Sequence, residues 1–133
     1  MFCRIVAGEV PAAVVLDEPE AFAFLDQRPV FPGHVLVVPR AHYDTLPDLP
    51  AELVQPLFTA VQRLAVAVVD GLGAQGTFVA VNNVVSQSVP HLHVHVVPRT
   101  KGDGLRGFFW PRQKYEDDEH MAAVAGTIRA ALH

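Results

Sequence analysis

Three histidines separated by single apolar residues are the part of this chain best suited to chemistry: His91, His93 and His95. Alternation with a period of two is typical of a half-buried β-strand, in which residues two apart project from the same face. The pattern therefore predicts that the three imidazoles share one face at steps of roughly 6.6 Å, while the intervening apolar residues face a core. Such a strand would present its imidazoles to a substrate or to a metal.

Three interpretations of these imidazoles are open. As a nucleophile set, one neutral imidazole attacks phosphorus while its neighbours fix its tautomer and move protons, and an ordinary pKa of about 6.5 leaves the attacking ring neutral at pH 7. As a metal site, three neutral imidazoles would suit Zn²⁺, but a hydrolytic metal usually also needs a carboxylate nearby. As structural residues, they would have no chemical role. No Asp or Glu lies between Gly71 and Lys101, which favours the nucleophile.

A polar loop, residues 82–88 (NNVVSQS), directly precedes the histidines. Its side-chain amides, hydroxyls and turn N–H groups can bind an anion without a formal positive charge. An ordinary polar turn has the same composition, but the adjacent histidines favour a phosphate-binding role.

Apolar periodicity predicts the elements that position these residues. Spacing of three and four residues predicts a core helix from about Asp48 to Gly71 and a helix over 116–132. Because Pro56 is tolerated only near a first turn, the core helix should begin after Asp48. Paired strands without βαβ alternation predict an α+β fold on an antiparallel sheet. The expected strands are Ala12–Asp17, Ala21–Leu25, His34–Val38 (stopped by Pro39), Thr77–Val81 and His91–Val97 (stopped by Pro98), after a short amphipathic segment Phe2–Val10.

Composition narrows the possible functions. The 133 residues fit one domain, and an apolar content of 50% with only 18% charged residues indicates that some apolar surface is buried in a homodimer. A net charge of −4 and scattered Lys and Arg argue against nucleic-acid binding. A single cysteine, no run of roughly 18 apolar residues and no signal pattern favour a cytoplasmic protein without membrane contact.

The run QSVPHLHVHVVPR resembles the signature of the histidine triad (HIT) family, whose three histidines alternate with apolar residues. The segments FCRIVAGEVPA and AFAFLDQRPVFPGHVLVVPRAH also resemble the family's amino-terminal helix and turn and its second and third strands. The resemblance implies a HIT-like fold of about five antiparallel strands and two main helices. It also implies a single HIT domain over residues 1–133, a homodimer, and hydrolysis or transfer of nucleotidyl groups. Residues 101–115 lie outside the family's common core.

The resemblance further implies a catalytic role for each matching residue. His93 would attack the α-phosphorus of a nucleoside phosphate ester, anhydride or amidate, and water would then hydrolyse the nucleotidylated ring. His91 would orient the nucleophile, His95 would hydrogen-bond phosphate oxygens or the bridging atom, and His34 would support the triad from beneath. Ser88 would contact the leaving group and could pass it a proton.

The nucleotide-binding residues follow in the same way, for a purine nucleotide or a nucleotide conjugate. Asp26 matches the family's acid that accepts both ribose hydroxyls. The phosphate oxygens would be held from the polar loop, by Gln87, Ser86 and one of Asn82 and Asn83. The base pocket would be walled by Phe2, Ile5, Val10, Phe24 and Leu25. Two rival functions are a nucleotide-binding regulatory module with negligible turnover and a metal-dependent hydrolase that uses the triad as ligands.

The chain departs from the family pattern in three places. Ser86 stands where the family has glycine, and its Cβ limits backbone angles and close approach to phosphate. Some relatives hold a structural zinc with a Cys-x-x-Cys pair and histidines such as His42, but Cys3 stands alone here. We therefore predict no bound metal and no required cofactor, with Mg²⁺ only as a complex with a polyphosphate substrate. The aromatic segment Phe108–Trp110, with Arg106 and Arg112, would pack at the dimer interface or cover the partner's pocket.

Overall fold

The computed structural model describes residues 1–105 and 112–132. It forms two compact units, Met1–Asp103 and Gly104–His133. The first unit holds the whole sheet, and the second holds the helix α3 (Asp118–Ala131), which matches the predicted carboxy-terminal helix. The aromatic segment Phe108–Trp110 and Arg106, expected at an interface, lie outside the described residues.

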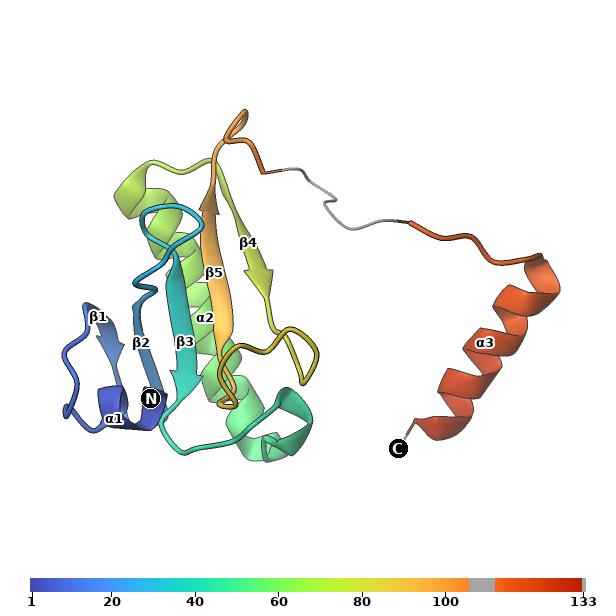
Figure 1. Cartoon of the computed structure of the whole chain (residues 1–133), viewed down its shortest axis with the longest axis horizontal. Helices are drawn as coiled ribbons and strands as arrows, with labels where there is room; N and C mark the ends of the chain where they lie inside the picture. Colours follow the sequence, from blue (N-terminus) through green and yellow to red (C-terminus); the bar gives the residue numbers. More distant parts are fainter. Residues whose placement is uncertain (106–111, 133) are drawn as a thin grey trace. The chain divides into compact units, whose positions relative to one another are not determined.

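The first unit is built on one antiparallel sheet of five strands in the order β1-β2-β3-β5-β4 (Figure 1). Each pair of neighbours runs antiparallel, which confirms the α+β fold with an antiparallel sheet. Strand β5, which contains His95 and begins directly after His93, lies inside the sheet between β3 and β4. The strands are β1 (Val14–Asp17), β2 (Ala21–Leu25), β3 (Val35–Pro39), β4 (Gly76–Ala80) and β5 (Val94–Arg99).

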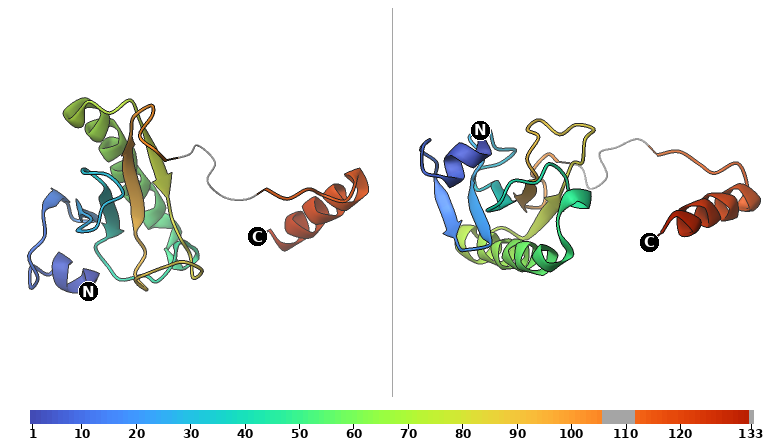
Figure 2. Two further views of the ribbon diagram at one scale, coloured as in Figure 1. Left: turned by 45° about the horizontal axis from the view of Figure 1, so that its top comes forward. Right: turned by 90° about the horizontal axis from the view of Figure 1, so that it is seen from below.

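The long helix α2 (Ala51–Leu72) covers one face of this sheet, as Figure 2 shows. It begins after Asp48, as predicted, but Pro56 lies inside the helix and past its first turn, so the expectation that Pro56 is tolerated only near a first turn is wrong. The helix ends at Leu72, and the following Gly73, with a φ of 72°, forms a left-handed helix cap. By length and composition alone α2 is apolar enough to cross a membrane, but its buried residues belong to the core that it forms with the strands. These buried residues are Leu57, Ala60, Val61, Leu64 and Val68.

Strand β2 shows how the sheet separates two apolar layers. Ala21 and Ala23 belong to the core with α2, and their small size lets the helix approach the sheet. Phe22 and Phe24 belong to a second cluster on the other face, with Phe2 from the short helix α1 (Phe2–Val6). This aromatic layer is where the histidines lie.

The predicted limits of the histidine strand are wrong at both ends. β5 begins at Val94 rather than His91, because the backbone before it bonds outside the sheet: the His91 amide donates to the Val89 carbonyl and the Leu92 amide to the Tyr43 carbonyl. The strand then runs through Pro98 to Arg99, beyond its pairing with β3, and among the strands of the described residues it pairs there with β4 alone, so the missing proline N–H costs little.

The limits of β3 also differ from the prediction by one residue. It begins at Val35 and includes Pro39, which pairs with Ala21 at the strand end. A short 3-10 helix, η1 (Leu46–Asp48), then leads into α2. The segment between β3 and η1 runs beside the histidines and contributes to the site.

Candidate active site

The three histidines share one face of the sheet, as the alternation predicts, although only His95 lies within β5. The rings of His93 and His95 have centroids 5.0 Å apart, and Phe2 contacts both His91 and His93 edge-on at 5.7 and 5.1 Å. Leu92, the residue between them, is buried in the core with α2. The site therefore forms where the aromatic layer meets the start of β5.

The His93 ring is held in one tautomer by the backbone. Its Nδ1–H donates to the carbonyl of His91 at 2.7 Å, which leaves the lone pair of Nε2 free. The residue is 4% exposed and packs against Phe2, so the ring has little freedom to rotate. An imidazole fixed in this tautomer, with Nε2 free of hydrogen bonds to the described residues, has the geometry that nucleophilic attack requires.

His95 lies next to the buried His34, and their facing nitrogens, His34 Nε2 and His95 Nδ1, are 2.9 Å apart. Burial is the main cause that lowers the pKa of His95 to about 4, with His93 and His34 adding to the effect. Burial also lowers the pKa of His34, against the opposing charge of Asp26. Both rings are therefore neutral at pH 7.

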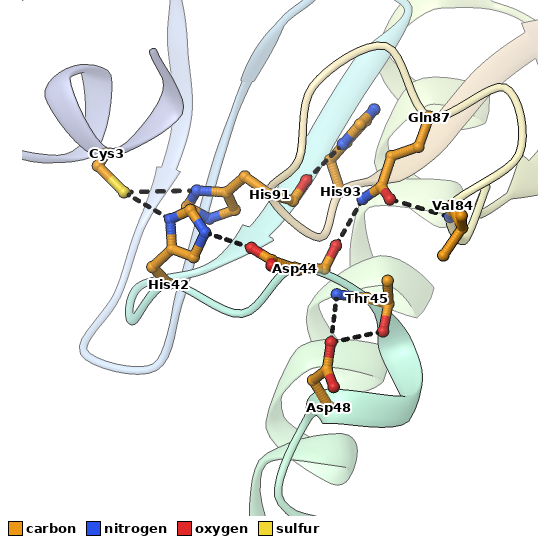
Figure 3. Close-up of polar contacts among 9 residues, drawn as sticks. All are labelled: Cys3, His42, Asp44, Thr45, Asp48, Val84, Gln87, His91 and His93. Carbon is orange, nitrogen blue, oxygen red and sulfur yellow. Dashed lines mark hydrogen bonds and ion pairs between the residues drawn. The ribbon is translucent and has the colours of Figure 1, made fainter.

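His91 faces a different set of groups on the amino-terminal side (Figure 3). Burial, with His42 close by, lowers the pKa of this ring to about 4, and among the described residues its Nε2 has no hydrogen-bond partner. Cys3 Sγ lies 3.0 Å from Nδ1 of His42 and 3.5 Å from Nδ1 of His91. The hydrogen bond to Cys3, followed by that to Asp44, raises the pKa of His42.

These donor atoms of Cys3, His42 and His91 lie within 4.8 Å of one another and are ligand types that Zn²⁺ prefers. Asp44 contacts the second ring nitrogen of His42 at 2.7 Å, as the outer partners of metal-bound histidines do. The residues thus fit a zinc ion, which would hold the His91 ring in place. The prediction of no bound metal remains a prediction.

The polar loop is tied to the segment after β3 by two side chains, Asn83 and Gln87. Asn83 Oδ1 accepts from the amide of Leu46 at 2.8 Å. Gln87 accepts from the Val84 amide and donates to the Asp44 carbonyl (Figure 3). Both side chains hold the loop in shape, so the phosphate contacts expected of Gln87 and Asn83 would compete with these bonds. Asn82 and Ser88 are exposed.

Ser86 has a φ of 62°, in the left-handed region that favours glycine. Val84, two residues earlier, has a φ of 68°, which is rarer still for a β-branched residue. Ser86 therefore adopts a backbone conformation that glycine would adopt more easily. Backbone strain of this kind is often kept at functional sites.

The predicted base-pocket residues line a single cavity of about 230 Å³. Its walls include all five apolar residues expected from the resemblance, and Asp26 also lines it. Phe2 joins this cavity to the triad, because it contacts both the pocket residue Phe24 and the His93 ring. The lining residues are Met1, Phe2, Ile5, Val10, Ala12, Phe24, Leu25, Asp26, Gln27 and Leu36.

Sequence analysis named Cys3 and His42 only in comparison with the zinc site of some relatives, and it did not predict that they contact each other. It also missed Asp44 and the contact of the Val30 amide with Nδ1 of His34 at 3.1 Å. The first depends on a contact between residues 39 positions apart. The second contact is made by a backbone N–H, which every residue except proline carries, so the sequence does not indicate it. For Asp44, the short spacing from His42 after a strand was the available sequence signal.

Comparison with known proteins agrees with this geometry. Residues 7–102 match the HIT domain. "Protein hit" of Bacillus subtilis is 39% identical over 99% of this chain and 93% of its own. Adenosine 5'-monophosphoramidase HNT1 of Saccharomyces cerevisiae is 31% identical over 90% of this chain and 74% of its own. The crystal structure of a HIT family member from Bacillus subtilis aligns with a TM-score of 0.90 and 33% identity, over 100% of this chain and 96% of that one. The matched region contains the whole sheet and all three triad histidines, and the chain belongs to the HIT family.

Proposed function

We propose that this protein is a nucleotidyl hydrolase or transferase that cleaves its substrates at the α-phosphorus through a nucleotidyl-His93 intermediate. The observation that carries the proposal is the bond from His93 Nδ1–H to the His91 carbonyl, which leaves Nε2 as a free nucleophile. In the first step Nε2 forms a bond to phosphorus, the bond to the leaving group breaks, and the leaving group takes a proton passed on from solvent by the Ser88 hydroxyl. In the second step water attacks the phosphorus, the bond between Nε2 and phosphorus breaks, and the proton lost by water returns to solvent. The products are a nucleoside 5'-monophosphate and His93 with its Nε2 lone pair restored.

The substrate class is a purine nucleoside 5'-phosphoramidate, a dinucleoside polyphosphate or an adenylylated small molecule. The apolar cavity suits a base, and Asp26 in its lining suits the ribose hydroxyls. A relative named as an adenosine 5'-monophosphoramidase supports the first of these classes. No step needs a protein-bound metal, and Mg²⁺ would act only as a complex with a polyphosphate substrate.

We propose that the protein is cytoplasmic, since its single cysteine is consistent with a reducing compartment, and that it forms a homodimer. The low charge content, with large apolar side chains exposed along the sheet edges, supports the dimer.

The decisive experiment is mass spectrometry of a rapidly quenched reaction with adenosine 5'-phosphoramidate. We expect an increase by one adenylyl group on the peptide that contains His93. His93→Ala should lose both this adduct and AMP release, whereas His120→Ala, an exposed histidine in α3, should keep both. Turnover that survives His93→Ala would contradict the nucleophile assignment.

The two rival functions predict different results in the same assay. A binding module without turnover would bind AMP and release no product from any of the three substrate classes. A metal-dependent hydrolase would lose activity with a chelator and regain it with Zn²⁺, and no adduct would form on His93. We expect neither result.

A further inference from the structure

The loop between β2 and β3, residues 26–34, contacts the triad through His34. The loop is closed by a hydrogen bond from the Asp26 amide to the His34 carbonyl at 2.9 Å. Inside it, the Val30 amide donates to Nδ1 of His34 at 3.1 Å, and Nε2 of His34 lies 2.9 Å from Nδ1 of His95. A backbone group is thus connected to His95 through one buried ring.

The direction of these bonds follows from the donor at the start of the chain. A backbone amide can only donate, so Nδ1 of His34 accepts and neutral His34 carries its proton on Nε2. That proton is donated to Nδ1 of His95, so neutral His95 carries its own proton on its Nε2. Burial lowers the pKa of both rings and keeps them neutral at pH 7.

We infer that His34 is a positioning residue which, set by the Val30 amide, keeps the proton of His95 on Nε2. This inference rests on the proposed function, in which that N–H faces the phosphate oxygens or the bridging atom. His93 has the opposite tautomer, because its Nδ1–H is donated to the His91 carbonyl. Nε2 of His93 therefore presents a lone pair, whereas Nε2 of His95 presents an N–H donor. The His91 carbonyl sets the first tautomer, and the Val30 amide sets the second through His34.

Asp26 makes the role of the Val30 amide testable. Its carboxylate lies 3.8 Å from Nδ1 of His34 and would favour a proton on that nitrogen. The Val30 amide opposes this. Without the amide, Nδ1–H would form toward Asp26, Nε2 of His34 would become an acceptor, and the proton of His95 would move to Nδ1. The charged and titratable groups facing His95 are His93, His34 and Asp26.

Val30→Pro removes this one N–H, and Val30→Ala is the matched control that keeps it. The Val30 side chain is 50% exposed, so neither change opens a cavity in the core. Ring tautomers are read by ¹⁵N NMR of the unliganded protein at pH 7. We expect Nε2–H at His95 and His34 in the wild type and in Val30→Ala, and a shift toward Nδ1–H at both rings in Val30→Pro. With adenosine 5'-phosphoramidate, kcat of Val30→Pro should fall at least about tenfold relative to Val30→Ala, with a smaller change in KM.

Wild-type His95 protonated on Nδ1 would overturn the inference, as would a folded Val30→Pro with unchanged tautomers. If Val30→Pro does not fold, His34→Phe, which removes the donor to His95, replaces it: loss of the Nε2–H preference at His95 is expected, and its retention overturns the inference. The NMR measurement uses no nucleotide. A wild-type protein with the expected tautomers and no turnover would therefore refute the proposed function and leave the tautomer assignment standing.

Discussion

At the scale of single residues, the hydrogen-bond partners of each histidine determine its reactivity, and the backbone angle of Ser86 strains the loop before the triad. The triad histidines have the same side chain, yet His93 offers a lone pair while His95 is neutral and bonded to a second histidine. The difference comes from their hydrogen-bond partners. Residue type alone therefore indicates that imidazole chemistry is possible, and the partners determine which ring performs which step.

Replacing Ser86 by glycine should stabilise the protein. The φ of 62° costs a residue with a Cβ about 1 kcal/mol or more, and part of this is offset by the extra freedom of glycine in the unfolded chain. We expect Ser86→Gly to raise the free energy of unfolding by about 0.5–1 kcal/mol in urea titrations. Ser88→Gly, in the same loop without a positive φ, should lower it; equal effects at both positions would contradict the strain argument.

The buried neutral state of His95 should make stability depend on pH. Its pKa is about 4 in the folded protein and 6.5 in the unfolded chain, so between these values only the unfolded chain is protonated. Stability should therefore fall as the pH drops from 6.5 to 4, by up to about 3 kcal/mol from this ring, and no further below 4. Urea unfolding at pH 7.5 and pH 5 should show a smaller difference for His95→Asn than for the wild type. His120→Ala should retain the full difference.

At the scale of elements, the loop that carries His34 is held against the end of α2. Gly33 has a φ of 97°, and a Cβ at this position would clash with Cδ1 of Leu72. Gly33→Ala should therefore destabilise the protein by roughly 1–3 kcal/mol, from strain and from the clash. The double variant with Leu72→Ala, measured by thermal unfolding, should recover the part due to the clash. No recovery would show that only the backbone angle matters.

At the scale of the whole molecule, we expect a dimer of about twice the chain mass of 14.5 kDa in light scattering. Of the two sheet edges, β1 has an irregular register between Val14 and Leu16, whereas β4 is regular along its five residues. Bulged edges resist pairing, so β4 is the edge suited to a second copy. Val79→Lys on β4 should weaken the dimer. Val15→Lys on β1, where Val15 is 46% exposed against 43% for Val79, should not. A monomeric wild type would contradict the dimer.

Local periodicity was sufficient to predict the antiparallel sheet, the core helix, and the face shared by the three histidines. These features depend on neighbours in sequence: alternation places side chains on faces whatever surrounds the strand. The residues of the base cavity were predicted from the resemblance to the HIT family, because their apolar pattern alone indicates only that they belong to a core. The start of β5 was missed because it depends on the Leu92 amide finding the Tyr43 carbonyl.

Only the tertiary structure decided how the histidines differ. The tautomer of His93, the chain from Val30 through His34 to His95, and the meeting of Cys3 with His42 all join groups by hydrogen bonds that residue spacing does not encode. Two of these bonds involve backbone groups, which every residue carries. A sequence can thus specify that imidazoles face a pocket, but the location of each proton depends on atoms that folding brings within 3 Å or so of the rings.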